Sequence, residues 1–406
     1  MKVLTVHNRY RSRGGEDEST DGEIKLFRGR GHEILGIIET NKIYGRKELL
    51  KIGIECIWSQ RAFRSTLQAI RKERPNLVKI HNFFPLLSPS VIYAASAEHV
   101  PVVMTLHNFR LICPGAGLFR NGKCCEQCLG KSIPWPALLH SCYRRSFWAT
   151  AAVSAMDAVH GFAGTWKSRV DLYIAPSEFA RRKFEQAGFP SEKLTVKPNF
   201  LLEDPGPGAG EGKYALFAGR LTAEKGLASL LEAWRMLKVR LPLKIAGEGP
   251  MLGDVQRMAE GLAGVEFVGR QPLDKVLQLM GRARVVIVPS IAYETFGRVV
   301  IEAFAKGTPV IASDCGALPE LVDHERTGLL FRPGDARDLA AKVEWFMTHP
   351  RQAEQMRREA RAEFIAKYTA ERNYQALMEI YQRVIEGRPV ATQPRPAIAR
   401  AAGHAG

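Results

Sequence analysis

Short apolar runs alternate with amphipathic stretches along the first half of the chain. Strands are predicted at 3–8, 32–38, 77–82, 100–108, 172–176 and 194–198. Apolar residues with helical spacing lie between these runs, for example at 61–72 and at 177–187, where Ser177 is placed to cap the helix. Alternation of strand and helix is typical of a mostly parallel, doubly wound sheet.

This alternation stops at 200–212 and then begins again. The segment FLLEDPGPGAGEG is rich in Pro and Gly and lacks apolar periodicity, which predicts a linker. The strands predicted after it lie at 214–218, 243–246, 265–268, 285–288 and 310–312. We therefore expect an α/β protein in which two doubly wound, Rossmann-like domains face a cleft, a favoured place for ligands.

The pattern also sets domain boundaries. We assign 1–199 to the first domain and 213–365 to the second. Two helices are predicted over 350–386, and we expect the last one, 366–387, to return to the first domain. The tail 388–406 is rich in Pro and Ala and has little to bury, so we expect it to be disordered.

Composition and charge narrow the function. The chain is 46% hydrophobic and no apolar run reaches the roughly 18 residues of a spanning helix. It starts with a strand rather than a secretory signal, so we expect a cytoplasmic protein. The net charge is +16, and residues 1–200 hold 30 Lys and Arg against 17 Asp and Glu. This half either faces an anionic partner or is simply a solvated basic surface. We expect no nucleic acid, because the basic residues are not interleaved with aromatic side chains.

The segment PSIAYETFGRVVIEAFAKGTPVIAS at 289–313 carries the strongest chemical signal. Glu294 and Glu302 flank a Phe-Gly step that opens a helix between two apolar strands. Glu294 therefore lies at the carboxyl end of a strand, where open α/β sheets bind ligands. The free amides at Gly297, Arg298 and Val299 suit a phosphate. A carboxylate beside an anion site fits a nucleotide-sugar, although two carboxylates alone could also indicate a hydrolase.

A second signal is GRLTAEKG at 219–226, between a strand and a helix. Arg220 and Lys225 bring two cations to a helix N-terminus, which suits a diphosphate. Alone, this could be an ordinary turn with solvated basic residues. Together with Glu294 and Glu302 it indicates a donor site.

These motifs resemble those of the retaining family-four glycosyltransferases of GT-B fold. The resemblance rests on GRLTAEKG, ETFGRVVIE and EAFAKGTPVIASDCGALPELV, and it covers essentially the whole second domain. In the first domain, Gly14-Gly15-Glu16 and Thr105-Leu106-His107-Asn108 match the glycine loop and the strand-end histidine of that family.

The resemblance implies roles in the second domain. Arg220 and Lys225 would hold the donor diphosphate, Glu294 the hydroxyls of the transferred sugar, and Glu302 the nucleotide ribose. Backbone near Gly269 and Arg270 would meet the base. The amides expected to support the sugar and phosphate are those of Phe296, Gly297 and Arg298.

In the first domain, the amide of Gly15 would approach the diphosphate, and His107 would lie near the transferred carbon and the acceptor hydroxyl. The chain has no Asp-x-Asp, so the cations would replace a divalent ion in catalysis. The resemblance implies transfer with retention from a UDP- or GDP-sugar to a saccharide or lipid-linked acceptor at the cytoplasmic membrane face. A nucleotide-sugar epimerase, a phosphorylase and a non-catalytic scaffold remain alternatives.

Five of the seven cysteines lie between 113 and 142. Cys125 and Cys128 have the spacing of a metal knuckle, and Cys113 and Cys142 could complete a tetrahedral structural zinc site. The extra Cys124 leaves the register open, and buried thiols that only pack are an equal alternative. The aromatic residues Phe83, Phe84, Trp135, Phe147 and Trp148, with Arg144 and Arg145, could form a lipid-facing edge or pack in the core.

Overall fold

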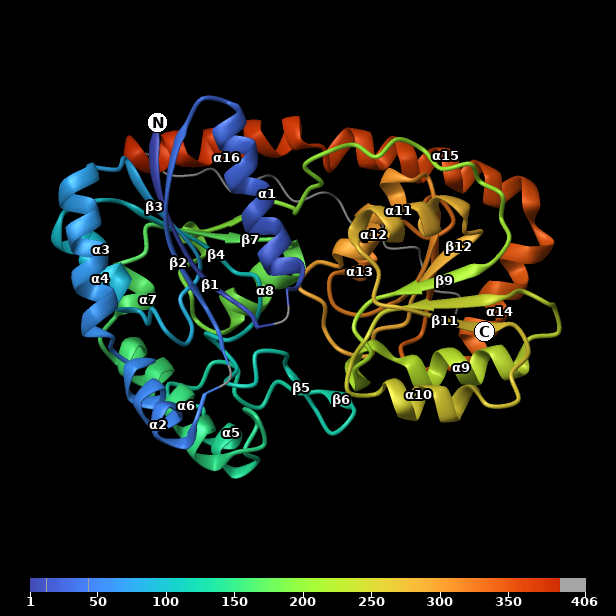
Figure 1. The fold of residues 1–406 in the computed structure, drawn as a ribbon, viewed down its shortest axis with the longest axis horizontal. Helices are drawn as coiled ribbons and strands as arrows, with labels where there is room; N and C mark the ends of the chain where they lie inside the picture. Colours follow the sequence, from blue (N-terminus) through green and yellow to red (C-terminus); the bar gives the residue numbers. More distant parts are fainter. Residues whose placement is uncertain (12, 43, 388–406) are drawn as a thin grey trace, which may run out of the picture.

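The chain folds into two α/β domains that lie side by side (Figure 1). The computed structural model describes residues 1–11, 13–42 and 44–387, so the predicted disorder of 388–406 concerns residues outside the described part. Each domain is built on a six-stranded parallel sheet flanked by helices. The predicted α/β architecture of two Rossmann-like domains is confirmed.

The first sheet has the strand order β2-β1-β3-β4-β7-β8. Its central strand β3 (Leu77–Asn82) is buried at every position, as expected for a parallel strand covered on both faces. The strand β4 (Val102–Thr105) is shorter than the predicted 100–108, and His107 therefore lies in the loop that follows it. The other strands of this sheet are β1 (Lys2–Arg9), β2 (Glu33–Thr40), β7 (Leu172–Ala175) and β8 (Leu194–Val196).

Three helices of this domain begin at a serine cap. Ser59, Ser146 and Ser177 accept hydrogen bonds from backbone amides three residues later. The helices are α1 (Gly15–Gly29), α2 (Arg46–Glu55), α3 (Gln60–Glu73), α4 (Ser90–Ala97), α5 (Trp135–Leu139), α6 (Phe147–Phe162), α7 (Thr165–Ser168) and α8 (Glu178–Gln186). A small hairpin of β5 (Phe119–Arg120) and β6 (Lys123–Cys124) projects toward the second domain (Figure 1).

The second sheet has the order β11-β10-β9-β12-β13-β14. Strand order reverses between β9 (Ala215–Ala218) and β12 (Val285–Val288), and a crevice at such a point is the usual ligand site of the fold. The sequence pattern missed β14. The remaining elements are β10 (Leu243–Ala246), β11 (Val265–Gly269), β13 (Val310–Ser313), β14 (Gly328–Phe331), α9 (Leu227–Met236), α10 (Leu252–Ala259), α11 (Leu273–Arg282), α12 (Arg298–Ala305), α13 (Leu318–Leu321) and α14 (Ala336–Thr348).

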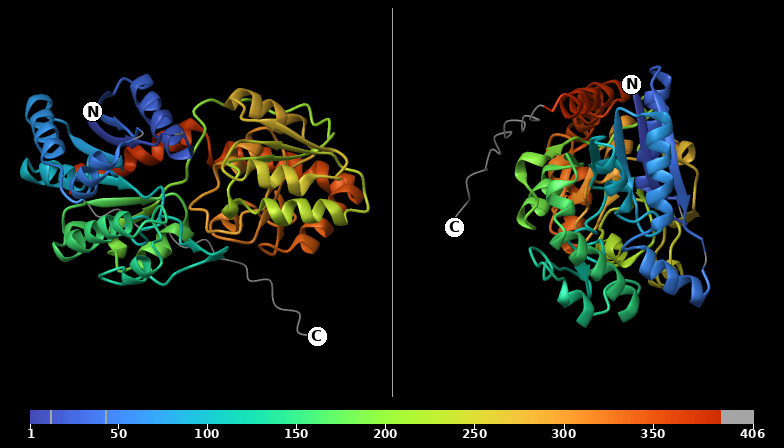
Figure 2. Two further views of the ribbon diagram at one scale, coloured as in Figure 1. Left: turned by 60° about the horizontal axis from the view of Figure 1, so that its bottom comes forward. Right: turned by 90° about the vertical axis from the view of Figure 1, so that its left-hand side faces the viewer.

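Two C-terminal helices join the domains. The helix α15 (Pro350–Lys367) packs on α12 of the second domain, while α16 (Ala370–Ile385) crosses to the first (Figure 2, left). There Leu377 and Tyr381 are buried with Phe27, and the Tyr381 hydroxyl donates to Glu23 at 2.7 Å. The predicted return to the first domain is thus confirmed for α16, whereas α15 stays on the second.

Candidate active site

The two predicted donor motifs meet at the reversal of strand order. Lys225 Nζ lies 2.5 Å from Glu294 Oε1, and the Ser290 hydroxyl donates to the same oxygen at 2.7 Å. Burial alone would raise the pKa of Glu294. The Lys225 ammonium, these hydrogen bonds and the more distant Arg220 outweigh it and lower that pKa. Glu294 is therefore a fixed carboxylate rather than an acid that titrates near neutral pH.

Glycines allow the two loops to approach this closely. Gly226 has φ +69°, and a Cβ there would lie 1.8 Å from the carbonyl oxygen of Pro289. Gly316 has φ +65°, and its Cβ would lie 2.6 Å from the Glu294 nitrogen. No other residue fits either position without backbone movement. The position of Glu294 is thus set by backbone packing on two sides.

Arg298 connects the start of α12 to the first domain. Its Nε lies 3.1 Å from Glu302 Oε1, and its Nη1 donates to the Phe200 carbonyl at 3.3 Å. A Cβ on Gly15 would lie 3.5 Å from Arg298 Cδ, so the glycine loop of the first domain reaches this helix N-terminus. Burial raises the pKa of Glu302 despite the opposing charge of Arg298. Gly15 from the first-domain motif therefore lies in one cluster with Arg298 and Glu302 from the second-domain motif ETFGRVVIE.

His107 lies at the junction of the domains. Its Nε2 is 3.0 Å from His81 Nδ1, and the Nε2 of His81 is 3.5 Å from Glu23 Oε1. A proton on His81 Nε2 faces the Glu23 carboxylate, so His81 Nδ1 accepts and His107 Nε2–H donates. Burial, followed by the neighbouring His81 and Lys79, holds the pKa of His107 well below its ordinary value. His107 is therefore neutral, and among the described residues none donates a hydrogen bond to its Nδ1 lone pair.

Glu16 is a residue of this site to which we assigned no role from the sequence. Its Oε2 accepts from Tyr10 at 3.2 Å and from Asn108 at 3.1 Å. Burial raises the pKa of Glu16 to about 8 despite these bonds. The only signal in the sequence was its place beside Gly15, because the contact to Asn108 joins segments 92 residues apart.

The other residues predicted from the sequence lie outside the clusters around Glu294, Arg298 and His107. Gly269 ends β11 on the same sheet edge, where its carbonyl accepts from the Gly247 amide at 2.8 Å, and Arg270 follows it with an exposed side chain. The amides of Phe296 and Gly297 precede α12. Cys113, Cys125, Cys128 and Cys142 line a separate cavity in the loops around the β5–β6 hairpin.

Two family models match most of the chain. The model described as Glycosyltransferase Family 4 matches residues 27–201, and the model described as Glycosyl transferases group 1 matches residues 203–363. Glycogen synthase of Mycobacterium tuberculosis is 28% identical over 341 residues, which are 80% of this chain and 72% of that protein. The D-rhamnosyltransferase WbpZ of Pseudomonas aeruginosa is 31% identical over 190 residues, 46% of this chain and 48% of that protein.

Solved structures show the same architecture at lower identity. Anabaena HepE superposes with a TM-score of 0.70 at 18% identity, covering 94% of this chain and all of that one. Sucrose-phosphate synthase from Thermosynechococcus elongatus gives a TM-score of 0.70 at 18% identity, covering 95% of this chain and 99% of that one. With both domains matched by family models and by solved structures, the chain belongs to the family-four glycosyltransferases of GT-B fold.

Proposed function

We propose that this glycosyltransferase moves a sugar from a nucleoside diphosphate to a saccharide or lipid-linked acceptor, with retention and without a catalytic metal ion. The observation that carries the proposal is the Lys225–Glu294–Ser290 cluster at the point where strand order reverses. A neighbour of the same fold, Anabaena HepE, was crystallised with UDP and with UDP-glucose, which supports a UDP-sugar donor.

The cations account for departure of the leaving group. Arg220 has an exposed side chain at the mouth of the site, and Lys225 lies deeper against Glu294. Held beside the diphosphate, they would neutralise the charge that develops on it as the sugar–oxygen bond breaks. Among the described residues no side chain donates to Oε2 of Glu294, which is the atom we assign to the sugar hydroxyls.

The first domain supplies the acceptor side. The His107 Nδ1 lone pair can accept a hydrogen bond from a sugar or acceptor hydroxyl, and Glu16 lies beside the neighbouring Asn108. Retention would leave the acceptor proton to the departing phosphate. Inversion would instead require a base in the protein, and Glu16 is then the group to consider.

The test is a donor screen by mass spectrometry, with UDP- and GDP-sugars and a lipid extract as acceptor. We expect one donor to give a glycosylated lipid or saccharide whose linkage keeps the donor configuration by NMR. An inverted linkage overturns retention. Nucleotide binding with no turnover across the panel indicates a scaffold, and isomerisation of the donor without acceptor indicates an epimerase.

A lipid-linked acceptor is favoured by the exposed surface of α2, α5 and α6, which lie together at one end of the first domain (Figure 1). Trp148 is 77% exposed and Phe162 is 70% exposed. This apolar surface comprises Leu50, Ile54, Trp135, Leu139, Phe147, Trp148, Val159 and Phe162. Phe83 and Phe84 do not belong to it, contrary to one reading of the sequence, because both are buried in the core.

Basic residues accompany these apolar side chains. Lys47, Lys51, Arg144 and Arg145 are exposed on or beside the same helices. Aromatic and aliphatic side chains flanked by Lys and Arg fit an anionic lipid surface. The contact we propose is with the surface of the bilayer. None of the helices within 1–11, 13–42 and 44–387 is long and apolar enough to cross a bilayer.

Flotation with vesicles tests the contact. We expect the protein to float with phosphatidylglycerol-containing vesicles and to lose most of that binding in Trp148→Glu/Phe162→Glu. Leu273→Glu is the control, because Leu273 is an exposed apolar residue of the second domain. Equal flotation of all three proteins would refute the assignment.

A further inference from the structure

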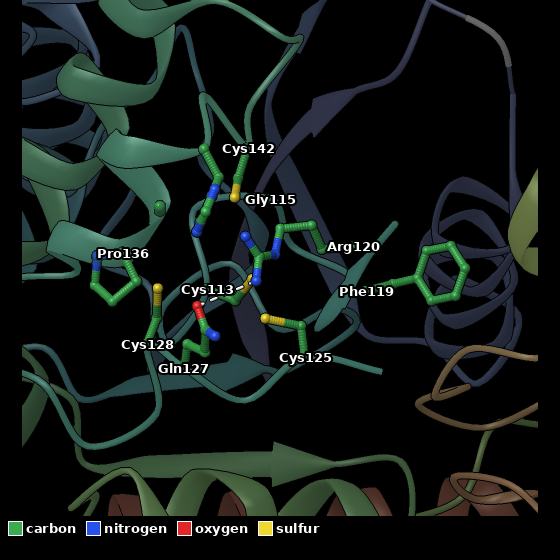
Figure 3. Close-up of a pocket in the computed structure, with 11 residues that line it drawn as sticks. Cys113, Gly115, Phe119, Arg120, Cys125, Gln127, Cys128, Pro136 and Cys142 are labelled. Carbon is green, nitrogen blue, oxygen red and sulfur yellow. Dashed lines mark hydrogen bonds between the residues drawn. The ribbon is translucent and has the colours of Figure 1, made fainter. Parts of the chain in front are cut away.

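Four cysteines face one small cavity in the first domain. Cys113, Cys125, Cys128 and Cys142 line it together with Arg120, and the cavity has a volume of about 20 Å³ (Figure 3). They come from three separate stretches: the loop after β4, the turn after β6 and the loop after α5. All four thiols are free. The fold of residues 113–142 therefore brings three separate loops to one cavity.

The fifth cysteine of the segment points elsewhere. The Cys124 thiol donates to the Ile291 carbonyl of the second domain at 3.5 Å. Cys124 is also absent from the residues that line the cavity. Cys125 and Cys128 therefore face the cavity, whereas Cys124 faces the second domain.

The cavity has the size and chemistry of a cation site. A volume of about 20 Å³ holds one water-sized particle. The side chains of Cys113, Cys125, Cys128 and Cys142 line the cavity, and sulfur is a ligand that zinc prefers in structural sites. Four thiolates would repel one another here unless a cation lay between them.

We propose that Cys113, Cys125, Cys128 and Cys142 bind one structural zinc ion. Each thiol would lose its proton to solvent and ligate through sulfur in a tetrahedral set, the usual geometry of a Cys₄ site. Zinc with four thiolates carries two negative charges, and the Arg120 guanidinium at the cavity would offset part of them.

The site requires the thiol groups to turn inward. In the described part of the chain, no three His, Cys, Asp or Glu side chains already lie close enough to hold a metal. Rotation about the Cα–Cβ bond moves a sulfur by an ångström or more without moving the backbone. Cys113 and Cys142 both lie next to Gly115. A Cβ on Gly115 would lie 3.8 Å from Cys113 Sγ and 3.7 Å from Cys142 Cβ.

The metal would hold a segment that has little regular structure of its own. Between β4 and α6 the chain forms only two-residue strands and a five-residue helix. The same segment contacts the donor side through Cys124 and through Glu126, whose carboxylate lies 2.7 Å from Lys183 Nζ and hydrogen-bonds Tyr293. Zinc would therefore hold the loop that contacts the residues next to Glu294.

The test measures metal content and free thiols in the intact protein, without an activity assay. Protein expressed with added zinc and purified without chelator should contain about one zinc per chain by elemental analysis. Cys125→Ser and Cys142→Ser should each lower the content at least about fivefold. Cys124→Ser is the matched control and should retain full content, since its thiol lies outside the cavity.

Two results would overturn the proposal. Wild-type protein with no zinc and seven titratable thiols would show that the cysteines only pack, and four fewer thiols with no zinc would show disulfides. Circular dichroism separates misfolded variants from folded ones that lack metal. If a variant misfolds, release of zinc from wild-type protein by a mercurial that titrates four thiols per metal keeps the proposal testable. Neither result depends on the proposed glycosyl transfer.

Discussion

The sharpest test of the proposed donor site is Glu294→Gln. Glutamine keeps the size of the side chain and an oxygen for Lys225 and Ser290, but it removes the negative charge and replaces the free Oε2 with an amide. A hydrogen bond to a charged group is worth about 1.5–3 kcal/mol. If that bond to the sugar is made in the transition state, kcat/KM should fall by about 10- to 150-fold.

The same geometry predicts what should not change. Arg220 and the amides of 296–298 remain in place in Glu294→Gln, so UDP or GDP should bind with a Kd within about threefold of wild type. Isothermal titration with the nucleotide and steady-state kinetics with the donor separate the two effects. Glu232→Gln, an exposed carboxylate on α9, is the control and should leave both unchanged.

A collapse of nucleotide binding in Glu294→Gln, with the fold intact, would refute the assigned role. It would mean that Glu294 acts mainly by positioning Lys225, to which it is bonded. Unchanged kcat/KM would also refute it, because the sugar would then be held elsewhere.

Two further predictions concern stability. The pKa of the Glu16 carboxyl is about 8 in the folded protein and has its ordinary value of 4.5 in the unfolded chain. The contribution of Glu16 to the free energy of unfolding therefore falls as pH rises between these two values. Glu16→Gln should remove that fall, which is on the order of 5 kcal/mol over the whole pH range, measured by urea unfolding at several pH values. Gly226→Ala should cost more than about 3 kcal/mol in the same assay because its Cβ would overlap the Pro289 carbonyl. Gly253→Ala on α10, with no heavy atom within 4 Å of its Cβ, should be neutral or stabilising.

The fold could be predicted because its signals are local. Buried parallel strands are continuous apolar runs, as in β3 and β12, and the linker is a change in composition. Predicted strand bounds were wrong where packing in the folded protein, rather than the length of the apolar run, decides which residues join the sheet. The predicted strand 100–108 continued through Leu106, which is buried by packing in the core rather than by the sheet, and β4 ends at Thr105.

The second-domain site was predictable for a different reason. Arg220, Lys225 and Glu294 follow two strands that are adjacent in the sheet, so their proximity follows from topology once the fold is known. The bonds of Glu16 to Tyr10 and Asn108, and of His107 to His81, depend on loop paths that no periodicity encodes. Burial within these loops, which the motifs do not encode, raises the pKa of Glu16 and lowers that of His107.

The contact between domains shows how the two halves of the site can work together. Thr295, next to Glu294, donates to the His107 carbonyl at 2.9 Å, and its own carbonyl accepts from the Ser177 hydroxyl at 2.7 Å. Each neutral hydrogen bond contributes about 0.5–1.5 kcal/mol net, so these two together favour the closed arrangement by about 1–3 kcal/mol. That is a factor of about 5 to 150 in favour of the observed contact, which holds Thr295, and with it the neighbouring Glu294, against His107. Further contacts join the same two domains, among them the Arg182–Glu320 ion pair and the Cys124–Ile291 hydrogen bond, so the domains are held together before any donor binds.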